Sequence, residues 1–114
     1  MSESSPTRFE IEQSPALNNH AIARCCAAWE PPYRAERAKG RTHLYASEGA
    51  GPAWVNAMPP LTGYENILDF IACAAHGIML GAIDEKRGSK LLYAAQIALG
   101  ALSREPKPLR RPAL

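Results

Sequence analysis

The sequence lacks any segment that is long and apolar enough to cross a membrane. Its longest apolar stretch, residues 67–83, is 17 residues long and is interrupted by Asp69 and His76. A transmembrane helix needs roughly 20 apolar residues. Residues 1–6 carry an acid and no apolar run, which argues against a secretory signal. We therefore expect a soluble, cytoplasmic protein.

Cysteine is also scarce, with three residues among 114. Cys25 and Cys26 are adjacent, and a disulfide between neighbours would strain the peptide that joins them. The odd number and this spacing argue against a disulfide framework. They favour a reducing compartment.

No catalytic signature is present: there is no glycine-rich phosphate loop, serine-centred elbow or metalloprotease pattern. Cys73 and His76 are spaced to share one helix face, and His20, Cys25 or Cys26 would complete a tetrahedral zinc site if they faced them. This is not the spacing of a known zinc motif, and a mid-helix cysteine lacks the setting of a reactive thiolate. We expect buried thiols, no metal or cofactor and no enzymatic activity. Asp69 interrupts the apolar helix and could pair with a buried arginine or with the Tyr93 hydroxyl. We favour a third alternative, in which Asp69 lies on the one solvent-exposed edge of the helix.

The net charge is only +2, and it is unevenly distributed. Residues 103–114 hold four basic residues and one acid, a balance of +3, so the rest of the chain carries 2 − 3 = −1. A basic tail on a nearly neutral domain is not the usual footprint of a nucleic-acid-binding fold. Local basic clusters nevertheless keep nucleic-acid contact open as an alternative. Its candidate residues are Arg34, Arg37, Lys39, Arg41, Lys86, Arg87, Lys90, Arg110 and Arg111.

The first half of the chain predicts helices that are broken by proline and glycine. Ser14-Pro15 is typical of a helix start, and Glu30-Pro31-Pro32 predicts its end or a sharp kink. Residues 33–39 resume a helix that ends near Gly40. A further helix is expected over 42–48, and the glycine- and proline-containing segment 49–52 separates it from a short helix carrying Trp54 and Met58.

The second half predicts two longer helices. Thr62 and Glu65 fit a capping box, and the helix that follows is apolar nearly all round, which is typical of a helix surrounded by protein. Gly77 and Gly81 add small side chains that would let a neighbouring backbone approach. Asp84 suits the N-cap of the next helix, and the short connection makes the two helices antiparallel.

Residues 81–98 contain an Ile-Asp turn and a Leu-Leu-Tyr-Ala run. This stretch resembles a helical hairpin of small uncharacterised bacterial proteins, over about the last 40 residues. The resemblance implies helices and a bacterial source. It assigns no activity and no site.

Together these patterns predict an all-α, bundle-like domain of four to five helices. Its centre is the antiparallel hairpin 62–82 and 84–103. The domain spans residues 14–103, between a flexible acidic arm, 1–13, and a disordered Pro/Arg-rich tail, 104–114.

Four aromatic residues fall in the half with broken helices: Trp29, Tyr33, Tyr45 and Trp54. Aromatic side chains near irregular backbone are candidate anchors for a protein partner or a second copy of the chain. Capping the core is an equally good role for them. We therefore expect a non-enzymatic assembly or adaptor protein, with the nucleic-acid-associated accessory protein as the alternative. No small-molecule substrate is predicted.

Overall fold

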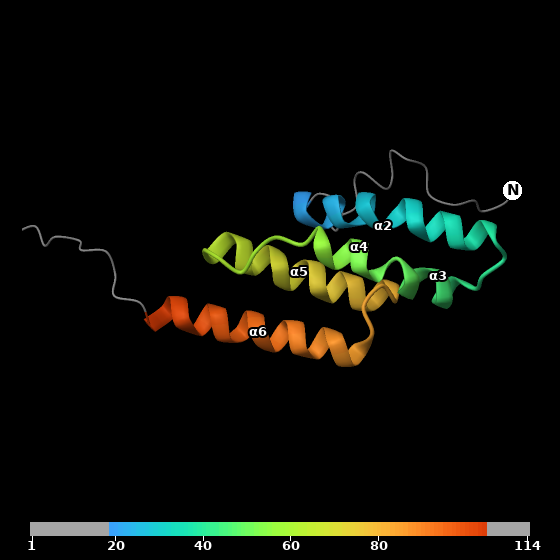
Figure 1. The fold of residues 1–114 in the computed structure, drawn as a ribbon. Coiled ribbons are helices and arrows are strands. Elements are labelled where there is room, and N and C mark those ends of the chain that lie inside the picture. Colours follow the sequence, from blue (N-terminus) through green and yellow to red (C-terminus); the bar gives the residue numbers. More distant parts are fainter. Residues whose placement is uncertain (1–18, 105–114) are drawn as a thin grey trace, which may run out of the picture.

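The computed structural model describes residues 19–104 and contains five helices and no strand in that range (Figure 1). The predicted all-α, bundle-like fold is confirmed. The arm at 1–13, the helix start at 14–15 and residues 105–114 of the tail lie outside the described residues. The helices are α2 (His20–Ala38), α3 (His43–Gly49), α4 (Gly51–Asn56), α5 (Tyr64–Leu80) and α6 (Glu85–Arg104).

Helix α5 is the centre of the fold, and the other helices are arranged around it. It packs against α2 on one side and against α6 on the other, as Figure 1 shows. The short helices α3 and α4 pack on α2, and α4 also reaches α5. The three long helices thus form a layer in the order α2, α5, α6, with α4 against one face of α5.

Helix α2 differs from the prediction at both ends. Asn19 has an extended backbone and its side chain accepts the Ile22 amide at 3.0 Å, so the helix begins at His20. Pro31 and Pro32 lie inside α2, which continues to Ala38. Of the two predicted alternatives, an end at Glu30 or a sharp kink, the end is therefore wrong. The ion pair between Arg34 and Glu30 spans the proline pair on the exposed side and supports continuation.

The α2–α3 and α3–α4 connections follow the predicted breakers closely. Gly40, with φ of +90°, follows the end of α2, and this left-handed conformation suits glycine. The Thr42 hydroxyl accepts the Tyr45 amide at 3.2 Å and caps α3. Only Ala50 separates α3 from α4, and Met58 lies just beyond α4.

The hairpin of α5 and α6 is confirmed to within two residues at each boundary. Asp84 caps α6 as predicted, accepting the Arg87 amide at 2.9 Å. The predicted capping box is wrong, because Gly63 with φ of +82° is the N-cap of α5 and makes no side-chain cap. The Thr62 carbonyl instead accepts a hydrogen bond from the Asn66 side chain at 2.9 Å.

The small residues of the hairpin lie against side chains and not against a backbone. A Cβ at Gly77 would meet both the Trp54 ring nitrogen and Ile83 at 2.7 Å. Gly81 ends α5 in the left-handed conformation. The tight contact between α5 and α6 is at Gly88, where a Cβ would lie 2.4 Å from Ile78. The small residue at Gly77, predicted to let a neighbouring backbone approach, thus makes room for the Trp54 ring of α4 more than for helix α6.

Candidate interaction surfaces

A cluster of rings joins the end of α2 to the start of α3, and we call it the aromatic corner: Trp29, Tyr33, Arg41, His43 and Tyr45. Trp29 and Tyr33 are stacked with ring centroids 4.3 Å apart. The Tyr33 hydroxyl is 2.7 Å from His43 Nδ1, and the two rings meet edge to face. Helix spacing of four residues on α2 and the Gly40 turn bring these rings together.

The rings of the aromatic corner differ in how much surface they offer. Trp29 is half-buried and its Nε1 donates to the Ser47 carbonyl at 3.4 Å. Tyr45 is 54% exposed, and the Arg41 guanidinium lies 4.9 Å from its ring centre. Three of the four predicted aromatic anchors thus lie on α2 and α3, which pack against each other.

Trp54, the fourth predicted anchor, lies in the core. Its side chain is fully buried, and its Nε1 donates to the Cys73 carbonyl at 3.0 Å. His76 stacks on its other side with ring centroids 5.8 Å apart. Trp54 offers no surface to a partner in this conformation, and it has the core role that was the alternative.

The basic cluster at 34–41 is largely paired within itself. Arg34 pairs with Glu30, and the Glu36 carboxylate holds both Lys39 and Arg41, at 3.3 and 3.2 Å. These hydrogen bonds hold the pKa of Glu36 below its ordinary value, the bond from Lys39 being the largest cause. Arg37 donates to the Arg41 carbonyl. A phosphate would therefore compete with existing partners for most of these cations.

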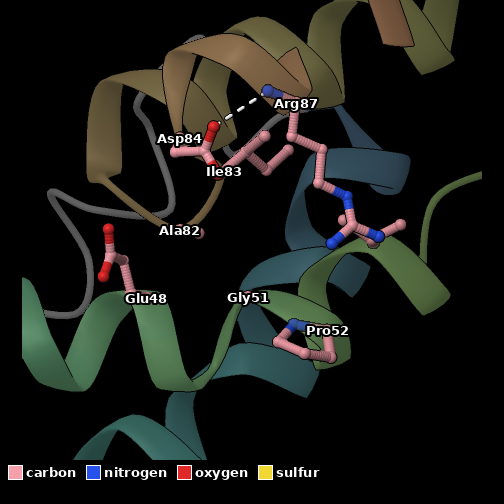
Figure 2. Close-up of a pocket in the computed structure, with 8 residues that line it drawn as sticks. Glu48, Gly51, Pro52, Ala82, Ile83, Asp84 and Arg87 are labelled. Carbon is pink, nitrogen blue, oxygen red and sulfur yellow. Dashed lines mark hydrogen bonds between the residues drawn. The ribbon is translucent and has the colours of Figure 1, made fainter. Parts of the chain in front are cut away.

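A second basic group, Lys86, Arg87 and Lys90, lies on the first two turns of α6. No ion pair joins any of the three to another described residue. Arg87 extends over a hollow of about 250 Å³ between α4 and the α5–α6 turn, with Glu48 on the opposite wall (Figure 2). Arg110 and Arg111 lie outside the described residues.

The thiols form a buried pair between α2 and α5. Cys25 and Cys73 are fully buried, free and in one apolar cluster. The hydrogen bond between the two buried thiols acts on them in opposite directions: together with burial it raises the pKa of Cys73, and it lowers the pKa of Cys25. Burial raises the pKa of the neighbouring Cys26, so Cys73 and Cys26 hold their protons. Protonated thiols are poor nucleophiles. Within residues 19–104 no three His, Cys, Asp or Glu side chains converge as metal ligands.

Asp69 accepts a hydrogen bond from the Asn19 side chain at 3.2 Å, a partner that the sequence did not indicate.

The described residues leave one face of α5 uncovered, whereas the sequence predicted a helix surrounded by protein. Met79 is 83% exposed, Tyr64 59% and Leu68 40%, and Ala75 is also exposed. These positions recur every three or four residues with Ile71 and Ala72 between them, so they form one stripe. We call it the bare face of α5: the exposed Tyr64, Leu68, Ala75 and Met79, with the half-buried Ile71 and Ala72, which also pack against the core, between them. Sequence reasoning singled out none of these residues, although their helical spacing was visible.

Two further findings bear on the class of protein. None of the described helices combines the length and apolarity of a membrane span. No protein-family model, curated protein or solved structure matches this chain.

Proposed function

We propose that this chain is a non-enzymatic helical assembly protein that binds a protein partner through the aromatic corner. The observation that carries the proposal is a pair of aromatic contacts on the neighbouring helices α2 and α3: Trp29 stacks on Tyr33, and the Arg41 guanidinium lies over the exposed ring of Tyr45. Trp, Tyr and Arg are the residues that dominate binding energy at protein interfaces. An exposed group of these types is therefore better suited to a protein surface than to a small substrate.

The corner is ordered before any partner arrives. The Trp29 indole is fixed by the Ser47 carbonyl, and the Tyr33 hydroxyl by His43. Ordering a side chain on binding costs about 0.5–1.5 kcal/mol for each rotamer-rich group. Rings that are already held avoid most of that cost, which supports their use as anchors.

The proposal places the protein in the cytoplasm, in accord with its thiols. Cys25 and Cys73 lie side by side in the core without a disulfide. Reduced cysteine pairs are typical of a reducing compartment. A bacterial source, which the likeness of residues 81–98 to bacterial hairpins implies, also remains a proposal.

Affinity purification from the native cell tests the aromatic corner. We would compare the tagged wild-type chain with Tyr45→Ala, and with Tyr93→Ala as the matched control on α6. Both tyrosines are more than half exposed, so neither change should disturb folding. We expect one protein to be recovered in stoichiometric amount with wild type and Tyr93→Ala, and to be lost with Tyr45→Ala. Equal recovery from all three samples would contradict the proposal.

The alternative function, contact with nucleic acid, is supported by Lys86, Arg87 and Lys90. Unlike the cluster at 34–41, these cations are not paired with any described acid. Phosphate contacts make the affinity fall steeply as salt rises. Gel retardation of generic DNA and RNA at low salt, lost at high salt and in Lys86→Ala/Lys90→Ala, would favour this function. Absence of retardation at low salt would remove it.

A further inference from the structure

We infer that a second copy of this chain covers the bare face of α5, so that the protein is a homodimer with its three-helix layers back to back. The face lies opposite α4: Trp54 of α4 meets α5 at Cys73 and Gly77, which point away from Leu68 and Met79 around the helix. Because α2 and α6 flank α5, this face is the open side of the layer.

The apolar composition of the bare face indicates that another protein surface packs against it. Its six side chains are all apolar or aromatic, and no charged residue falls within the stripe. Single exposed apolar residues are ordinary, but an aligned apolar patch marks an interaction site. The helix as a whole is apolar nearly all round, which is typical of a helix surrounded by protein. The described residues of one copy, 19–104, leave that cover incomplete.

The order of side chains along α5 fits a second copy of the same helix running antiparallel. With a two-fold axis between Ile71 and Ala72, Tyr64 lies against Met79 of the partner and Leu68 against the partner's Ala75. Large side chains at the ends thus meet, and at the crossing Ile71 lies against Ala72 of the partner subunit. A two-fold interface requires this kind of self-complementarity. Antiparallel helices also bring opposite ends of their dipoles together.

The available area suits a stable dimer only if the whole layer takes part. Seventeen residues of α5 give a helix about 25 Å long and about 10 Å wide, or about 250 Å². A layer of three such helices offers about 750 Å², close to the roughly 800 Å² that each partner buries in a standard interface. On α6, Leu91 packs against the buried core on the side of α4, whereas the half-buried Leu92 does not. Helix spacing places Leu92 beside the bare face.

The first test is the mass of the full chain by light scattering. We expect twice the 12.4 kDa of one chain for wild type, and 12.4 kDa for Met79→Glu. Ile97→Glu is the matched control, because Ile97 is 52% exposed on the outward side of α6 and should leave the dimer intact. Met79 is exposed in the single chain, so circular dichroism should show both variants folded. We expect Met79→Glu to raise the dimer Kd at least about tenfold.

The second test is a charge swap that reports the antiparallel arrangement. Residues 64 and 79 lie about 22 Å apart along one helix, too far to pair within a chain. In the dimer each lies against the other's position on the partner. Tyr64→Lys and Met79→Glu should each weaken the dimer, and the two together in one chain should restore it.

The outcomes separate this inference from the proposed function. A mass of one chain for wild type at every concentration would overturn the inference and leave the bare face to a different protein. A dimer unaffected by Met79→Glu would overturn it as well. A dimer weakened by Met79→Glu but not restored by the swap would reject the antiparallel pairing. Tyr45→Ala should remain dimeric, so loss of the partner at the aromatic corner leaves the dimer untouched.

Discussion

Helices α2 and α6 flank the same central helix but are held to it in different ways. α2 meets α5 through Asn19 and Asp69 and through the thiol pair, and it meets α3 through the Trp29 indole. Within residues 19–104, no side-chain hydrogen bond or ion pair joins α6 to another helix. Only Gly88 and Ala95 of α6 are fully buried.

The difference shows what fixes each flank of the layer. Hydrogen bonds are directional, so they set the register of α2 along α5. Apolar packing is non-directional, and α6 is positioned by the shape of its contact at Gly88. Elements with few buried contacts open at lower free energy than the rest of a fold. We expect α6 to be the flank that opens first.

Trp54→Ala should have the largest effect, because it removes the wedge between α2 and α5. The side chain is the largest that is fully buried, and truncating a buried tryptophan costs about 3–5 kcal/mol. Chemical denaturation should show a loss of that size, with little change for Tyr93→Ala on the outward side of α6. A loss below about 1 kcal/mol would mean that α2 is held mainly by its polar contacts.

Gly88→Leu should act on the other flank. The added side chain would clash with Ile78 and force α6 outward, at a cost of about 1–3 kcal/mol. Hydrogen exchange should lose protection in α6 while α2 and α5 keep theirs.

Gly100→Ala is the control within α6, since an added Cβ would meet only the flexible end of Arg104 at 3.6 Å. Alanine is favoured over glycine in a helix by about 1 kcal/mol, so this change should stabilise α6. Protection lost equally from α2 and α6 in Gly88→Leu would show that the two flanks open together.

The hairpin was predictable because its signals are local. Asp84 and the apolar spacing of α5 and α6 fix two long helices and their short connection, whatever surrounds them. The end of the helix predicted at the proline pair was wrong because the course of α2 there depends on contacts that are not local. Helix α2 is stabilised on both sides of Pro31 by tertiary contacts, the Trp29 indole to the Ser47 carbonyl and the Tyr33 hydroxyl to His43, which outweigh the local penalty.

The candidate sites were predictable only in part. Tyr33 and Tyr45 were predicted as anchors because they fall in the half of the chain with broken helices, but nothing local separates them from Trp54, which is buried in the core. The bare face was missed because an apolar pattern does not say which protein covers it. That information lies in the position of α4 around α5, which depends on contacts between residues far apart in the sequence.

Asn19→Ala tests the polar attachment of α2 at its first turn. The side chain caps the helix through Ile22 and donates to Asp69, so its loss should cost about 1 kcal/mol. Asn19→Ser keeps a capping oxygen but cannot donate as an amide to Asp69, and it should cost less. The comparison, measured by thermal denaturation, divides the effect between the cap and the contact with α5. If Ser and Ala cost the same, the hydrogen bond to Asp69 carries the attachment.

The smallest expected effect concerns the far end of α2, where Glu36 holds Lys39 and Arg41. The folded-state pKa of Glu36 is below its ordinary value, so these ion pairs contribute fully above the unfolded pKa and are lost as the pH falls through the folded one. A carbon-detected NMR titration should place the Glu36 midpoint below the ordinary value of a glutamate. Arg41→Gln should raise the Glu36 midpoint, because it removes one of the two cations that hold the carboxylate. Because the group is exposed and screened, the melting temperature should barely change. A large fall in the melting temperature of Arg41→Gln near neutral pH would show instead that this cluster, and not the core around Trp54, fixes the end of α2.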